Sequence, residues 1–491
     1  MRLLLIALSL GLLLAAQFCA GRREAPAAEY ASVAPTTTRQ AAEPVALRLR
    51  ALLDTTGAGA AATTEKWGLQ AGAAVYALYG SPAQPLWTQP ADSLSRAAHD
   101  ALILLARAPE HGLPRAAYHW LRLQALRDSL ARPALPAERR AATQARLELY
   151  LSDGLLRFLL DLHRGRLRTY TASARERAAG QPFRPEQVLR EALTAGRLDQ
   201  LPAGCQPANR EYRQLQQALA RWLRATPADS AAARRPRYEL AALNLERWRW
   251  DALADEEYVL INLPAFELQV IAADSLMRRH RVIVGEAETP TPTLSSRITH
   301  FTLAPDWYVP RSIASRELLT WLKRDPGYLA RNNYSLYDTR GRPLNPHQIN
   351  WQPVTPENFA YSFRQSAGCD NALGNIVFRF ANPYAVYLHD TPLRQFFEQP
   401  ERAFSHGCIR LEQPMELAAY LLRREGRPVE LPSEAECARQ PRPRDVRLRR
   451  PLPLHIRYAT CAAQSGELVF YPDVYRRDPG LRRALFAPGQ L

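Results

Sequence analysis

The chain has 491 residues, too many for one compact core, so we expect two or three domains. Lys and Arg total 64 against 48 Asp and Glu, which gives a formal net charge of +16. A basic surface suits nucleic acid, an anionic membrane or an acidic ligand. The sequence has no zinc-finger spacing, helix-turn-helix pattern or aromatic RNA-binding motif, so we expect no nucleic-acid partner.

Residues 1–20 have a basic start followed by an apolar run that is too short to span a membrane, which is typical of an export signal. Cys19 lies where a lipoprotein signal carries its lipidated residue, although the bulky Phe18 stands where processing prefers a small one. Cleavage near Ala20, lipidation of Cys19 and retention as an uncleaved anchor all stay open. Each predicts a periplasmic protein, and the last two add a membrane anchor.

Residues 21–45 are rich in Ala, Pro, Thr and Glu and are predicted to be a flexible linker. Residues 46–224 are predicted to form a mainly helical scaffold domain, with helical periodicity at 95–106, 147–162, 185–195 and 209–223 and one short strand at 74–79. Residues 225–237 are predicted to be a second linker, and residues 238–255 a connecting helix.

Residues 256–432 change in character, with strand patterns at 258–262, 266–271, 280–284, 299–303, 375–380 and 385–389 and helices at 312–323 and 413–423. A long polar segment at about 324–365 is predicted to be a lid. Residues 433–491 are predicted to be a C-terminal extension with closing strands at 452–461 and 467–471. Its arginine-rich part, 439–450, is expected to be solvated and poorly ordered, with no role assigned. The fold class is therefore multidomain α+β.

The six cysteines are too widely spaced to form a disulfide framework. Disulfides among Cys205, Cys369, Cys437 and Cys461 are left open, and the simpler interpretation of each is a small apolar core residue.

One cysteine has a chemical context. Cys408 lies in the run Ser405-His406-Gly407-Cys408-Ile409-Arg410-Leu411, and His389 precedes it in a β-rich segment. A thiol reacts as its thiolate, and a histidine within hydrogen-bond reach promotes that form. A zinc site would need a fourth ligand or a Cys-x-x-Cys pair, so we expect no metal.

Several blocks of this region together resemble the L,D-transpeptidase catalytic domain, and in particular the large, scaffold-bearing periplasmic branch of the murein L,D-transpeptidases. The blocks are Asn371-Ala372-Leu373-Gly374, Tyr387-Leu388-His389-Asp390-Thr391-Pro392 and the run around Cys408, with residues 244–250, 281–285, 289–292, 307–313, 378–380 and 382–383. The resemblance is strong over about residues 240–475 and weaker over 46–222.

The resemblance implies a cysteine acyl-enzyme without a cofactor. Cys408 would be the nucleophile and His389 its base, and the backbone carbonyl of Asp390 would orient the imidazole. The backbone amides of Gly407 and Cys408 would form the oxyanion hole, with His406 supporting the loop.

Two further residues of the motif are implied to bind substrate, namely Arg410 and Ser405. Arg410 would orient the loop or bind a substrate carboxylate, and an internal salt bridge is an equally good interpretation.

The function implied is the formation of 3→3 cross-links between the stem peptides of peptidoglycan. Water, a free D-amino acid or a protein lysine as acceptor stays open, which would make the enzyme a carboxypeptidase, an exchange enzyme or a protein-anchoring enzyme. A non-catalytic wall-binding scaffold is the alternative from another class. The oligomeric state is left open.

The chain departs from this branch in two places. The branch usually carries a peptidoglycan-binding module where only residues 225–237 stand here, so we expect that module to be absent. Ala367-Gly368-Cys369-Asp370 replaces the usual Pro-Gly ahead of the Asn371 block.

Overall fold

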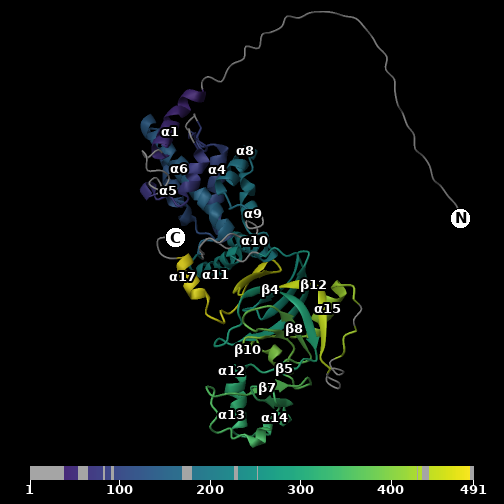
Figure 1. Cartoon of the computed structure of the whole chain (residues 1–491). Helices are drawn as coiled ribbons and strands as arrows, with labels where there is room; N and C mark the ends of the chain where they lie inside the picture. The colour runs from purple at the N-terminus through teal and green to yellow at the C-terminus, as the bar shows by residue number, and fades with distance from the viewer. Residues whose placement is uncertain are drawn as a thin grey trace, which may run out of the picture.

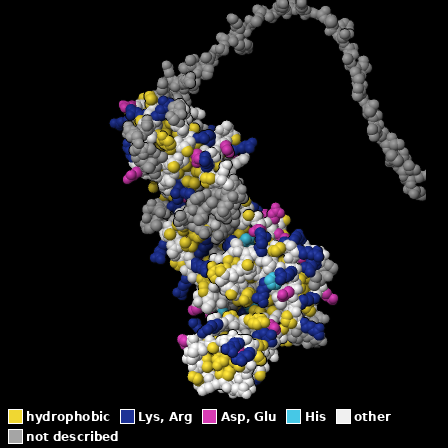
Figure 2. All heavy atoms as spheres, viewed as in Figure 1, with side chains coloured by type: hydrophobic (Ala, Val, Ile, Leu, Met, Phe, Trp, Pro, Cys, Tyr) yellow, Lys and Arg dark blue, Asp and Glu magenta, His cyan; other side chains and the backbone are white. Residues whose placement is uncertain are grey.

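The computed structural model describes residues 38–53, 65–80, 83–89, 93–167, 180–225, 231–250, 253–427, 430–433 and 442–486. The export signal predicted at 1–20 lies outside the described residues. Figure 1 shows three units in a row, with a helical domain at one end, a β-rich domain in the middle and a small lid at the other end. On the face that Figure 2 shows, Arg and Lys side chains are spread over all three units and do not gather in one patch. Within the described ranges, no helix is both long and apolar enough to cross a membrane.

The helical domain is built around one long helix, α6, which contacts α1, α3, α4, α5, α8 and α9. Leu147, Leu151 and Phe158 of α6 are fully buried in its core. The helices are α1 (Thr38–Leu53), α3 (Gly72–Tyr79), α4 (Arg96–Ala106), α5 (Trp120–Leu130), α6 (Ala137–Arg164), α8 (Pro185–Ala195), α9 (Leu201–Cys205), α10 (Arg210–Ala225) and α11 (Ala231–Trp250), with short 3₁₀ turns η1 (Ala108–His111), η2 (Arg115–Tyr118) and η3 (Leu198–Gln200).

Two predictions in this region were wrong. The strand predicted at 74–79 is helix α3, because its buried residues Gly72, Val75, Leu78 and Tyr79 recur at helical spacing and pack on α6 and α8. Helix α1 begins inside the segment predicted as a flexible linker, in a stretch of good helix formers such as Ala, Arg and Leu.

The β-rich domain is a nine-stranded sheet in the order β10-β3-β11-β9-β8-β4-β12-β1-β2. Strand β3 pairs with β2 as well as with β11, so the two ends of the sheet meet and eight strands close into a ring. Helix α15 contributes Leu417 and Leu421 to the apolar core of this domain. The elements are β1 (Glu257–Asn262), β2 (Glu267–Ala272), β3 (Ser275–Gly285), β4 (Leu294–Leu303), β8 (Ile376–Phe380), β9 (Leu388–His389), η7 (Arg394–Glu398), β10 (Ala403–Ser405), β11 (Ile409–Leu411), α15 (Pro414–Arg424), β12 (Arg444–Arg457), a hairpin of β13 (Cys461–Gln464) and β14 (Glu467–Phe470), and α17 (Asp478–Leu485).

The described arginines of the segment 439–450 are exposed, as expected, but the expected poor order was wrong, because β12 begins at Arg444 and pairs with β4. Val446 and Leu448 are buried and alternate with exposed arginines, which is the pattern of a strand with one buried face. The strand lies between β1 and β4, so the central sheet includes residues beyond 432.

The lid is folded around its own apolar core and is larger than predicted. It covers residues 307–365, and Leu318 and Leu322 of the helix expected at 312–323 pack with Leu336 and Phe363. Its elements are β5 (Trp307–Tyr308), α12 (Arg311–Ile313), a π-helical turn η5 (Ala314–Leu318), α13 (Leu319–Leu322), α14 (Tyr328–Arg331), β6 (Tyr334–Tyr337), η6 (Pro346–Gln348) and β7 (Ser362–Gln365). The apolar residues spaced through this polar segment account for the core.

Helix α11 joins the scaffold to the sheet, and it starts at Ala231 inside the predicted second linker. The side chain of Asn244 accepts from the backbone N–H of Thr460 at 2.9 Å, and Arg247 pairs with Asp478 at 2.7 Å. The sequence block 244–250 is therefore a structural junction between the two domains.

Candidate active site

The predicted base ends strand β9, and the predicted nucleophile directly precedes the neighbouring parallel strand β11. In the pairing of β9 with β11, His389 lies opposite Arg410 and Leu388 lies opposite Ile409. Leu388 and Ile409 are fully buried in the core of the ring. Because side chains alternate along a strand, His389 and Arg410 lie on the opposite face from the core, and Cys408 is the residue directly before β11.

The imidazole of His389 is buried and held from one side. Its Nδ1 lies 2.5 Å from the backbone carbonyl oxygen of Asp390, so the tautomer with hydrogen on Nδ1 donates there and leaves the Nε2 lone pair available. Burial, with a smaller contribution from the positive charge of Arg410, lowers the pKa of His389 to about 3. The imidazole is therefore neutral at physiological pH.

Asp390 is fixed by both its backbone and its side chain. Its backbone N–H donates to Ile376 at 2.9 Å, and its carboxylate accepts from the backbone N–H of Asn375 at 2.9 Å. Gly374 makes room for this carboxylate, because a Cβ at that position would lie 2.5 Å from it. The block around Asn371 thus positions the carbonyl that holds His389.

The loop before Cys408 is held by hydrogen bonds within the protein. The hydroxyl of Ser405 accepts from the backbone N–H of Gly407 at 3.2 Å and donates to the carbonyl of Cys408 at 2.5 Å. Thr291 donates to the carbonyl of Gly407 at 2.9 Å and accepts from Gly285 at 2.8 Å. Ser405 is 2% exposed, and its hydroxyl is engaged by these two hydrogen bonds within the loop. The amide of Gly407, expected in the oxyanion hole, is engaged by Ser405.

The thiol of Cys408 rests in its neutral form. Burial raises its pKa, and a backbone hydrogen bond from Tyr387 and the charges of Arg410 and Arg379 oppose that effect only in part. Together with the neutral imidazole of His389, this pKa shift disfavours the preformed thiolate–imidazolium pair that the sequence context had suggested. Proton transfer must then accompany attack on a substrate.

Two arginines give this face of the sheet its positive charge. Arg410 is largely buried, and no carboxylate within the described part of the chain pairs with it, so the internal salt bridge considered from sequence is not formed there. Arg379 was not predicted as a site residue. It lies two positions from Val377, which is opposite His389, and its guanidinium stacks 4.7 Å from the ring of Tyr387. The sequence does contain a signal for Arg379, because a charged residue stands between the two phenylalanines of the run 378–380.

The side chain of His406 contacts the lid and is not part of the cluster around the thiol of Cys408. Its Nε2 lies 2.8 Å from the carboxylate of Glu317 in the π-helical turn, and both side chains are about half exposed. Glu317 was also missed, because nothing in its local sequence indicates a partner 89 positions along the chain.

Four cysteines lie within the described residues, and of these Cys369, Cys408 and Cys461 form no disulfide with another described residue. Cys205 and Cys461 are buried, as the simpler interpretation expected, and Cys369 is exposed. Cys19 and Cys437 lie outside the described residues.

Comparison with known families agrees with this architecture. Residues 256–431 match YkuD, the L,D-transpeptidase catalytic domain, and residues 73–219 match the scaffold domain.

A Haemophilus influenzae protein named "Putative L,D-transpeptidase" is 34% identical over 220 residues, which are 45% of this chain and 44% of that protein. The chain thus spans less than half the length of this curated relative. Among solved structures, the Ldtfm–avibactam carbamoyl enzyme is 11% identical over 42% of this chain and 51% of that chain, with a TM-score of 0.21. An L,D-transpeptidase from Mycobacterium smegmatis is 14% identical over 41% of this chain and 58% of that chain, with a TM-score of 0.19. These two superpositions are too weak to bear on fold or function. The two family matches and the curated relative show that the chain carries an L,D-transpeptidase catalytic domain of the YkuD family, preceded by a scaffold domain.

Proposed function

We propose that this protein is an exported, periplasmic peptidoglycan L,D-transpeptidase that forms 3→3 cross-links through an acyl-enzyme on Cys408. The observation that carries the proposal is the placement of His389 at the end of β9 and of Cys408 directly before the adjacent strand β11, with Nδ1 of His389 held by Asp390 at 2.5 Å. A nucleophile, a base and a group that orients the base are the minimum set for thiol acyl transfer.

In the first half-reaction, the Cys408 sulfur attacks the carbonyl carbon of the peptide bond between the third residue of a tetrapeptide stem and its terminal D-Ala. Nε2 of His389 takes the thiol proton as the bond forms and gives it to the departing amine of D-Ala. This route fits the neutral resting state of both groups, since general-base catalysis does not need a preformed thiolate.

The oxyanion of the tetrahedral intermediate needs hydrogen-bond donors in place before reaction. The backbone N–H of Cys408 is the first candidate, because the N–H of Gly407 already donates to Ser405. The guanidinium of Arg410, which pairs with no carboxylate among the described residues, supports binding of a carboxylate of the donor stem.

In the second half-reaction, the side-chain amine of the diamino acid in a second stem attacks the thioester. His389 takes the proton from this amine, the new amide forms, and the proton returns to the departing sulfur. The stem peptides are therefore both acyl donor and acyl acceptor. The reaction balances without a metal ion or a nucleotide.

Purified protein incubated with disaccharide-tetrapeptide tests this function. Mass spectrometry should detect cross-linked dimers with release of one D-Ala per dimer. If disaccharide-tripeptide forms without dimers, water is the acceptor. If correctly folded protein forms neither product, the proposal is overturned.

A further inference from the structure

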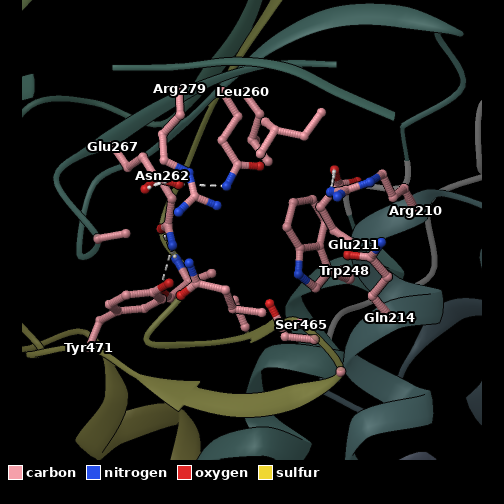
Figure 3. Close-up of a pocket in the computed structure, with 18 of the residues that line it drawn as sticks. Arg210, Glu211, Gln214, Trp248, Leu260, Asn262, Glu267, Arg279, Ser465 and Tyr471 are labelled. Atoms are coloured by element: carbon pink, nitrogen blue, oxygen red, sulfur yellow. Dashed lines mark hydrogen bonds and ion pairs between the residues drawn. The ribbon is translucent and has the colours of Figure 1, made fainter. Parts of the chain in front are cut away.

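A cavity lies between the scaffold and the catalytic sheet, away from Cys408. Its volume is about 640 Å³, and its walls come from α10, from Trp248 of α11, from strands β1 to β3 and from the β13–β14 hairpin (Figure 3). Neither β9 nor β11 contributes to it. A volume of this size is in the range of sites that hold small ligands.

The charged groups around this cavity already have partners within the protein, which are carboxylates for Arg279 and Arg210 and a backbone carbonyl for Arg221. Arg279 pairs with Glu267 at 3.3 Å, and the carboxylate of Glu211 accepts from the hydroxyl of Tyr258 at 2.6 Å. Arg210 and Arg221 donate to the backbone carbonyls of Asp274 and Gly466 at 3.1 and 2.6 Å, respectively. Binding an ion here would compete with these contacts, so the cavity is better suited to an uncharged ligand.

Neutral polar groups are the ones left available in the wall. The side-chain amides of Gln214, Gln217 and Gln464 make no hydrogen bond within the part of the chain that the structure describes. Each amide offers two N–H donors and a carbonyl acceptor, which matches the hydroxyl and acetamido groups of a sugar. Ser465, at the tip of the hairpin, adds a hydroxyl on the rim.

Aromatic rings complete the match. Figure 3 shows Trp248 and Tyr471 on different sides of the cavity, one from the helix α11 and the other following the hairpin. Trp248 is 5% exposed and packs in a core, so the half-buried Tyr471 is the ring whose negative face can attract the polarised C–H groups on the flat face of a pyranose. A ring combined with unengaged amides is the chemistry that recognises carbohydrate, whereas the carboxylates of a peptide would have to displace the existing contacts of Arg210, Arg221 and Arg279.

We propose that this cavity binds an uncharged oligosaccharide and, resting on the proposed function, that its natural occupant is the N-acetylated glycan strand of peptidoglycan. Held there, the strand would bind where scaffold and catalytic domain meet, on a surface separate from the one that receives the stem peptides. The domain junction at Asn244 and Thr460 gives this surface a fixed geometry.

The test is calorimetric titration of the full chain with a soluble β-1,4-linked N-acetylglucosamine tetramer. The wild-type protein and Cys408→Ala should bind it equally. Ala463→Trp, which places an indole in the cavity, should weaken binding by at least about tenfold, equivalent to about 1.4 kcal/mol. Equal binding by folded Ala463→Trp would overturn the proposal, and so would binding of a free stem peptide in place of the tetramer.

A second variant guards against misfolding of Ala463→Trp. The double change Gln214→Ala and Gln217→Ala alters only half-buried or exposed side chains and should also weaken binding by about tenfold. Gln187→Ala, an exposed glutamine on α8, is the matched control and should bind normally. Acylation of Cys408, measured separately, distinguishes the two proposals. Acylation without tetramer binding overturns only the glycan site, and tetramer binding without acylation overturns only the proposed reaction.

Discussion

Nε2 of His406 in the cysteine loop lies 2.8 Å from the carboxylate of Glu317, so the lid contacts the residue two positions before the proposed nucleophile. A polar contact this exposed contributes about 0–1 kcal/mol, which is enough to bias a lid without locking it. The lid has its own apolar core, so we expect it to move as a unit.

Glu317→Gln should therefore leave the melting temperature within error of the wild type and change the KM for a stem-peptide donor more than kcat. The physical reason is that the lid would spend more time away from the loop while the thiol and its base stay in place. Glu357→Gln on the same lid is the control. A drop in kcat with unchanged KM would contradict a role in lid positioning.

The resting protonation of the site can be measured by alkylation. Burial raises the pKa of the Cys408 thiol, so its thiolate fraction at neutral pH is lower than that of an ordinary thiol. Because His389 has a pKa of about 3, it is uncharged above that pH and cannot stabilise a thiolate. The iodoacetamide reaction rate at Cys408, followed by peptide mass mapping, should rise steadily from about pH 7 to pH 10. A plateau between about pH 5 and 7 would instead reveal a thiolate–imidazolium pair.

Substitutions at two glycines with nearly the same φ distinguish the effect of steric crowding against Asp390 from that of a left-handed backbone conformation. Gly374 and Gly426 have φ values of 60° and 62°, but only at Gly374 would a Cβ meet the carboxylate of Asp390. Gly426→Ala should cost about 1–2 kcal/mol in urea denaturation, the usual penalty of a left-handed residue. Gly374→Ala should cost about 3 kcal/mol or more and also slow acylation, because Asp390 and with it His389 would shift. Equal costs and normal acylation in both variants would refute this positioning role.

Arg410 offers a test of substrate recognition. Arg410→Lys keeps the charge near the thiol but loses the two-pronged guanidinium, so kcat/KM for a tetrapeptide donor should fall by about 10–100-fold, mainly through KM. A substrate whose carboxylates are amidated should be nearly insensitive to the change. Arg483→Lys, at an exposed position on α17, is the control. If both substrates lose activity equally, Arg410 supports the loop and does not bind the carboxylate.

Sequence reasoning went furthest where local pattern decides structure. The strands around 258–262 and 266–271 and the helices at 185–195 and 413–423 are present with nearly the predicted bounds, because period and flanking residues determine them. It failed at α3, where a short apolar run fits either a strand or a buried helix. It also failed at β12, where the many arginines obscure the alternation of buried apolar residues.

Within the site, the residue types could be found from sequence but their contacts could not. The pairing of β9 with β11 joins segments separated by a loop and a 3₁₀ turn, and its register determines that His389 faces the same side as Arg410. The hydrogen bonds of Ser405 and the reach of His406 to Glu317 depend on the folded loop and lid, so no spacing predicts them.

The central claim is that Cys408 carries the acyl group with His389 as its base, and intact-protein mass spectrometry after incubation with a carbapenem tests it most directly. We expect one adduct per chain, mapped to the peptide that contains Cys408 and absent from Cys408→Ala. His389→Asn should slow its formation by about 10²–10⁴-fold, while His99→Asn, an exposed histidine on α4, should not. An adduct on Cys408→Ala, or wild-type acylation rates in His389→Asn, would contradict the account.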